Sequence, residues 1–106
     1  MKKAIEVIRE FNKERDWDQF HTPANLAKSI SIEAGELLEC FQWNDDYDRE
    51  HLLEELADVH SYVLMMADEL GVDLDEITIS KYEKNAAKYP ADEFRGNSAK
   101  YNEIKR

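Results

Sequence analysis

One long apolar seam constrains the fold of this chain more than any other feature of its sequence. Its six members are separated by alternating steps of four and three residues: Leu52, Leu56, Val59, Val63, Met66 and Leu70. A seam with this spacing runs along one side of an α-helix and needs other helices to cover it. We therefore expect residues of about 49–70 to form a long helix in a bundle, capped by Asp48 and ended by Gly71.

Three further segments have helical periodicity. The first spans about residues 2–14, where Ile5, Ile8 and Phe11 recur every three residues. The second begins with Thr22-Pro23, a good N-cap followed by the residue suited to the first helical position, and continues to about residue 41. The third, about residues 74–89, ends at Pro90. Residues 16–21, 42–47 and the tail beyond Pro90 are expected to be loops.

Two long and two shorter helices with short connections favour an all-α antiparallel bundle. The 106 residues suit a single domain, residues 1–106. With only 3 Gly and 2 Pro, the chain is a poor candidate for a sandwich or barrel of many short strands. Because a chain this small cannot cover its own seam, we expect homo-oligomerisation to complete the bundle.

Charge and composition exclude several classes of protein. Residues 32–76 hold one basic and 15 acidic residues, a net charge of −14 that would repel a nucleic-acid polymer. No apolar run approaches the roughly 18 residues of a membrane-spanning helix. The basic N-terminus lacks the apolar stretch of a signal peptide, and the single cysteine, Cys40, excludes an internal disulfide. These features predict a cytoplasmic protein that binds neither membrane nor nucleic acid.

Two pairs of acids carry the candidate chemistry, Glu33 with Glu36 and Glu55 with Asp58. In each pair the three-residue spacing places both side chains on one face of a helix, beside the apolar stripe. Burying carboxylates without a partner costs several kcal/mol each, so a cation must compensate. Oxygen-only ligands favour Mg²⁺, with Mn²⁺ as a possible substitute. The Glu-x-x-His pattern of di-iron bundles is absent, because Ala57 stands three residues before His60.

A cationic and polar face follows on the next predicted helix, formed by Lys81, Asn85 and Lys88. Acids that bind a metal ion, together with lysines at the edge of the site, can hold a triphosphate without a glycine-rich loop. Each acidic pair taken singly is weak evidence for a metal site, because helices often carry acids at this spacing on solvated faces. A non-catalytic, acidic helical interaction module therefore remains the alternative from another class.

Motifs along nearly the whole chain, in the same order, resemble one enzyme family. They are Arg15-Asp16-Trp17-Asp18-Gln19-Phe20-His21, Glu33-Ala34-Gly35-Glu36-Leu37, Phe41-Gln42-Trp43, Glu54-Glu55-Leu56-Ala57-Asp58-Val59, Ser80-Lys81, Asn85, Lys88-Tyr89-Pro90, Arg95-Gly96 and Lys100-Tyr101. The sequence resembles the MazG-like all-α nucleoside triphosphate pyrophosphohydrolases, and within them the dCTP pyrophosphatase branch.

The resemblance implies Mg²⁺-dependent hydrolysis of an NTP or dNTP, dCTP or a related pyrimidine nucleotide, to the monophosphate and pyrophosphate, in nucleotide-pool sanitation. It implies a homodimer or a dimer-of-dimers tetramer. Vertebrate members of the branch tend to have His where this chain has Ile8, so a broad-specificity dNTP/NTP pyrophosphatase remains open.

The resemblance also implies a role for each matching residue. The metal ligands are Glu33, Glu36, Glu55 and Asp58. Either Glu33 or Glu36 would take the proton of the attacking water. The phosphate- and sugar-binding residues are Lys81, Asn85, Lys88, Tyr89 and Tyr62, and the base-binding residues are Trp17 and Trp43.

Overall fold

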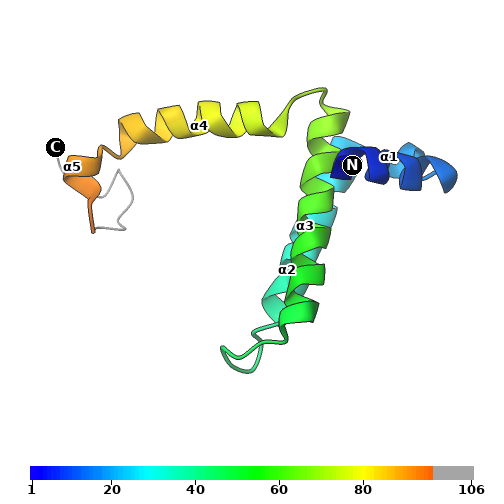
Figure 1. The fold of residues 1–106 in the computed structure, drawn as a ribbon, viewed down its shortest axis with the longest axis horizontal. Coiled ribbons are helices and arrows are strands. Elements are labelled where there is room, and N and C mark those ends of the chain that lie inside the picture. The colour runs from blue at the N-terminus through cyan, green and yellow to red at the C-terminus, as the bar shows by residue number, and fades with distance from the viewer. Residues whose placement is uncertain (97–106) are drawn as a thin grey trace. The chain divides into compact units, whose positions relative to one another are not determined.

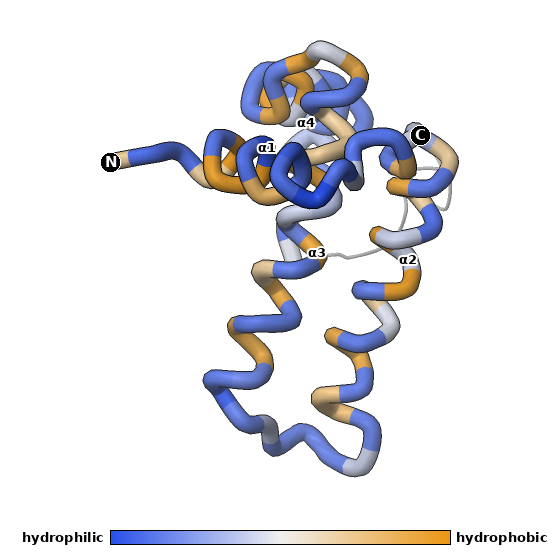
Figure 2. The backbone as a smooth tube through the Cα atoms, turned by 90° about the vertical axis from the view of Figure 1, so that its right-hand side faces the viewer, coloured by the Kyte–Doolittle hydropathy of each residue, from blue (hydrophilic) through white to orange (hydrophobic). Residues whose placement is uncertain are grey.

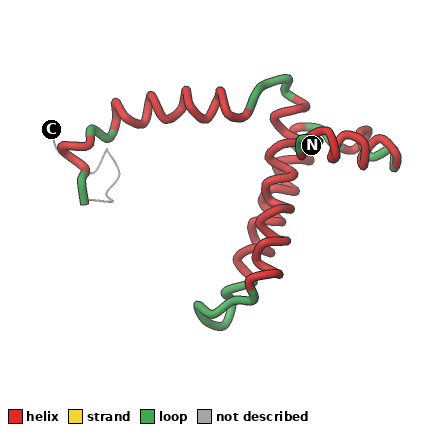
Figure 3. Tube along the Cα trace, in the orientation of Figure 1, coloured by secondary structure: helices red, strands yellow, loops and turns green. Residues whose placement is uncertain are grey.

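The computed structural model describes residues 1–96, and every regular element in this range is helical (Figure 3). The elements are α1 (Ala4–Glu14), the 3₁₀ turn η1 (Asp18–Phe20), α2 (Pro23–Glu39), α3 (Arg49–Glu69), α4 (Leu74–Lys88) and α5 (Ala91–Phe94). The predicted all-α fold is confirmed. Each of the four predicted helices is present, with ends within two residues of those expected.

The helix ends follow from the capping residues in the sequence. The backbone N–H of Asn25 donates to the Thr22 hydroxyl at 3.2 Å, directly ahead of α2. At α3 and α4, the carboxylates of Asp48 and Asp73 accept backbone N–H groups at 3.1 Å and 3.0 Å. Gly71 follows α3 with φ of +68°, a conformation that glycine adopts without steric cost. These local contacts explain why the helix bounds could be predicted.

Two segments predicted as loops contain short helices. Residues 18–20 form η1 within the expected break. The prediction of a loop directly after Pro90 is wrong for Ala91–Phe94, which form α5. Proline suits a helix start, and the Phe94 ring meets the Tyr89 ring edge-on at 4.9 Å, which holds this single turn in place. Lys100 and Tyr101, which belong to the family motifs, lie outside the described residues.

The chain divides into two compact units, one comprising residues 1–72 and the other beginning at Asp73. The first unit contains α1, η1, α2 and α3, and the second contains α4 and α5. That the whole chain forms a single domain therefore stays a prediction.

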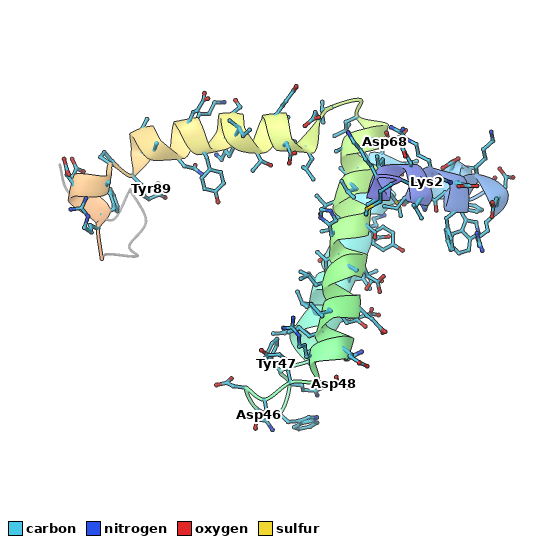
Figure 4. The ribbon with its side chains drawn as sticks, viewed as in Figure 1. Lys2, Asp46, Tyr47, Asp48, Asp68 and Tyr89 are labelled. Carbon is cyan, nitrogen blue, oxygen red and sulfur yellow. The ribbon has the colours of Figure 1, made fainter. Side chains whose placement is uncertain are left out.

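Within the first unit, α2 and α3 form an antiparallel hairpin (Figures 1 and 2). Leu26 of α2 is almost completely buried, with 1% of its surface exposed. The connecting residues 40–48 are mostly hydrophilic (Figure 2), and the rings of Phe41 and Tyr47 meet edge-on at 5.5 Å. Asp46, Tyr47 and Asp48 lie in this loop at the end of the hairpin (Figure 4). The loop thus closes a hairpin that brings the two acid-bearing helices together.

Helix α1 packs near the C-terminal end of α3, away from the hairpin loop (Figure 1). The Arg9 guanidinium forms an ion pair with the Asp68 carboxylate, and the Nε atom of Arg9 donates to Asp68 at 3.1 Å. The side chain of Asn12 is buried beside Met65 and contacts its sulfur. These contacts fix α1 against α3 and, with it, the turn that carries Trp17.

The apolar seam of α3 is only partly covered within one chain. Leu56 and Leu70 are 51% and 57% exposed, and the other four members of the seam are half-buried. A hairpin of two helices leaves one side of each helix open, so apolar surface remains for a further helix to cover. None of the helices in residues 1–96 combines the length and apolarity needed to cross a membrane.

Candidate active site

Four carboxylates meet where α2 faces α3. One side-chain oxygen from each of Glu33, Glu55 and Asp58 lies within 4.8 Å of the other two. Glu36 adjoins them, close enough to interact through hydrogen bonds with both Glu33 and Glu55. The antiparallel hairpin places the Glu33 turn of α2 opposite the Glu55 turn of α3, so the four predicted metal ligands do come together.

This carboxylate cluster is electrostatically unfavourable as it stands. The Oε2 atoms of Glu33 and Glu55 are buried and have no hydrogen-bond partner within residues 1–96. A hydrogen bond with the Glu36 carboxyl, followed by burial and the neighbouring negative charges, raises the pKa of Glu33 to about 7. Burial, followed by the charge of Glu36, also raises the pKa of Glu55. The cluster therefore has the properties of a cation site made of oxygen ligands.

The raised pKa of Glu33 predicts how stability depends on pH without metal. Folded Glu33 keeps its proton to about pH 7, whereas the unfolded carboxyl loses it near 4.5. Between these values the folded state binds more protons, so stability falls as pH rises. We expect the Tm in excess chelator to decrease from pH 5 to pH 8. Glu33→Gln should flatten this slope and Glu39→Gln, at an exposed position on α2, should keep it. An unchanged slope in Glu33→Gln would contradict the assignment.

A groove of about 290 Å³ lies between α1, the η1 turn and α3. It brings together Trp17, Tyr62 and Asp58, three residues predicted to act on base, sugar and metal. Burial, followed by the charges of Glu33 and Asp58, raises the pKa of the Tyr62 hydroxyl. One groove thus connects an aromatic wall to the carboxylate cluster, the combination that a nucleotide with its phosphates requires.

The turn after α1 positions the Trp17 ring. Asp16 adopts a φ of +53°, which short polar side chains tolerate, and the backbone N–H of Trp17 donates to the Asn12 carbonyl at 3.0 Å. The Trp17 ring then meets Phe11 edge-on at 5.7 Å, and the Arg15 guanidinium lies 3.7 Å from the centre of the Phe11 ring. The aromatic wall is therefore held by local contacts before any ligand arrives.

The structure does not bring Trp43 to this groove. Trp43 is 87% exposed in the α2–α3 loop, at the opposite end of the hairpin from α1. Within one chain it is therefore separate from Trp17, and its role at a base stays a prediction.

Of the five residues predicted to bind phosphate and sugar, all but Tyr62 belong to the second unit. Lys81, Asn85 and Lys88 lie on α4, and Tyr89 directly follows it. Lys81 and Lys88 are exposed and Asn85 is half-buried. The backbone N–H of Tyr89 donates to the Asn85 carbonyl at 2.8 Å. Their shared face on α4 is as expected, and their action on phosphate stays a prediction.

Seven residues that line the groove were not among the predicted site residues: Val7, Ile8, Phe11, Asn12, His21, Ser61 and Met65. A signal for Asn12 exists, because Ile5, Ile8 and Asn12 follow steps of three and four and place a polar side chain on the apolar stripe of α1. His21 follows η1 and ends the Arg15–His21 motif of the family resemblance, although no role was predicted for it.

Comparison with known proteins shows the family of this chain. The MazG-like family matches residues 28–104, and the chain belongs to this family. It is 41% identical to dCTP pyrophosphatase 1 from Mus musculus over 97% of the chain and 69% of that protein. It is 42% identical to dCTP pyrophosphatase 1 from Homo sapiens, over 95% of the chain and 68% of that protein.

A solved structure has the same fold. It is a pyrophosphatase from Archaeoglobus fulgidus DSM 4304, which superposes with a TM-score of 0.74 and is 43% identical, over 81% of this chain and 88% of the other. Together, the family, these relatives and the shared fold place the chain among the nucleoside triphosphate pyrophosphohydrolases.

Proposed function

We propose that this chain hydrolyses dCTP, or a closely related pyrimidine nucleotide, to the monophosphate and pyrophosphate with Mg²⁺, in nucleotide-pool sanitation. The observation that carries the proposal is the carboxylate cluster, which opens onto a groove walled by Trp17. The names of the mouse and human relatives support the choice of dCTP.

The residues present fit a hard divalent ion. Two buried carboxylate oxygens of the cluster lack a partner, and every donor atom there is oxygen. Glu33, Glu36, Glu55 and Asp58 would hold Mg²⁺, with Mn²⁺ as a substitute. When bound, such an ion neutralises phosphate charge and makes water a better nucleophile.

The chain's own groups divide the remaining tasks. Glu33 or Glu36 takes the proton of the attacking water, whose oxygen bonds to the α-phosphorus while the bond from this phosphorus to the bridging oxygen breaks. Lys81 offsets the charge of the leaving pyrophosphate. Asn85, Lys88, Tyr89 and Tyr62 bind phosphate and sugar, and Trp17 stacks on the base. Trp43 stacks on a base only where a second copy of the chain brings it there, because within one chain it lies at the other end of the hairpin.

A substrate panel tests this function. The protein is incubated with Mg²⁺ and each of the common NTPs and dNTPs, and the monophosphate and pyrophosphate are quantified. We expect the highest kcat/KM for dCTP. Similar values across the panel would favour the broad-specificity alternative, and no hydrolysis of any nucleotide would favour the non-catalytic interaction module.

We also propose that the active form is a homodimer or a dimer of dimers. Each fully buried seam residue would contribute roughly 1.5–3 kcal/mol, and Leu56 and Leu70 are half exposed in one chain. Two-fold pairing covers this surface most simply. Light scattering should therefore give about two or four times 12.5 kDa. A stable, active 12.5 kDa species at nanomolar concentration would refute the assembly.

A further inference from the structure

Asn12 places a buried amide in an otherwise apolar part of the groove wall. The other α1 residues that line the groove are Val7, Ile8 and Phe11, none of which offers a hydrogen-bonding side chain. Asn12 is only 4% exposed. A buried carboxamide is costly unless both of its ends find partners, so the partners of Asn12 decide what the groove can bind.

The Nδ2 atom of the Asn12 amide has a hydrogen-bond partner, and the Oδ1 atom has none among the described residues. Nδ2 donates to the Sδ atom of Met65 at 3.6 Å. Oδ1 accepts no hydrogen bond from any residue that the structure describes, and part of its surface remains accessible. Because the contact with the sulfur uses one of the two Nδ2 hydrogens and fixes which way the amide faces, Oδ1 remains as an acceptor.

The other polar groups of the groove provide a second acceptor, belong to the carboxylate cluster or can present either polarity. The Ser61 hydroxyl donates its hydrogen to the Ala57 carbonyl of its own helix at 2.8 Å, so its oxygen, like Oδ1 of Asn12, can only accept. Asp58 belongs to the carboxylate cluster and Tyr62 adjoins it. His21 can present either a donor or an acceptor, depending on its tautomer, so it does not separate ligands by polarity.

We infer that Asn12 makes the groove prefer an amino pyrimidine over an oxo pyrimidine, with Met65 as the positioning residue. Cytosine carries an exocyclic amino donor where uracil and thymine carry a carbonyl acceptor. The Oδ1 atom accepts a hydrogen bond from the amino group of cytosine and repels the carbonyl oxygen of uracil or thymine. This inference rests on the proposed function and names the residue that selects its base.

Two variants test the inference, with kcat/KM measured for dCTP and for dUTP. Asn12→Leu keeps the side-chain size and removes the amide. It should lower the dCTP-to-dUTP ratio by about tenfold or more, mainly through loss of dCTP hydrolysis. Met65→Leu removes the sulfur, so the amide can turn over and offer its donor. Here the ratio should fall mainly because dUTP hydrolysis rises.

Met66→Leu is the matched control, since Met66 is the next residue of α3 and belongs to the seam rather than the groove lining. It should keep the wild-type ratio. Circular dichroism checks folding, and if Asn12→Leu does not fold, Met65→Leu alone carries the test. Ratios within twofold of wild type in the folded variants would overturn the inference.

The inference and the proposed function fail in different ways. If the wild type prefers dCTP and the folded variants keep that preference, only the role of Asn12 is overturned. Equal hydrolysis of dCTP and dUTP by the wild type also overturns it and leaves a pyrophosphohydrolase. Absence of nucleotide hydrolysis in the wild type overturns the proposed function itself.

Discussion

Replacing Glu36 by Gln, or Asp58 by Asn, should lower kcat/KM by about a hundredfold or more while the helical fold persists. Each change removes a carboxylate oxygen from the cluster that holds the cation and keeps the size of the side chain. In the metal-free protein, each also removes one of several crowded negative charges. The Tm in chelator should therefore stay the same or rise by a few degrees.

Exposed acids on the same helices provide the controls. Glu39→Gln on α2 and Glu54→Gln on α3 make the same chemical change outside the cluster. Both should retain a rate within about twofold of wild type, as is usual for surface substitutions. If Glu36→Gln or Asp58→Asn also kept a near wild-type rate with unchanged metal dependence, the ligand assignment would be wrong.

Excess chelator should reduce turnover to roughly 1% of the wild-type rate or less, because without a cation neither the carboxylates nor the triphosphate are neutralised. Adding Mg²⁺ beyond the chelator should restore activity, and Mn²⁺ should substitute for it. Soft or large ions should restore less.

A folding control separates this effect from loss of structure. The helical circular dichroism signal should persist in chelator, since the described helices have their own caps and packing. Full turnover in excess chelator, with the fold intact, would contradict the metal requirement.

Much of the fold and of the carboxylate cluster could be predicted because both depend on local periodicity. Thr22, Asp48 and Asp73 mark the helix starts in the sequence and cap them in the structure. The three-residue spacing within each acidic pair places both acids on one face. A short loop then requires α2 and α3 to be antiparallel, which brings the two faces together.

The remaining features depend on contacts that periodicity does not encode. The α5 turn is held by the contact of the Phe94 ring with Tyr89, which directly follows α4. Trp17 and Trp43 both flank helices, and only the folded hairpin shows that they lie at opposite ends of it. Asn12 interrupts an apolar stripe, and its role depends on the sulfur of Met65, more than fifty residues away.

Hydrolysis in ¹⁸O-labelled water reports which phosphorus atom of the nucleotide the water attacks. The wild-type protein is incubated with dCTP and Mg²⁺, and the products are analysed by mass spectrometry. We expect equal amounts of dCMP and pyrophosphate, with one ¹⁸O atom in dCMP and none in the pyrophosphate released. Label in the pyrophosphate, or dCDP and orthophosphate as the products, would contradict attack at the α-phosphorus.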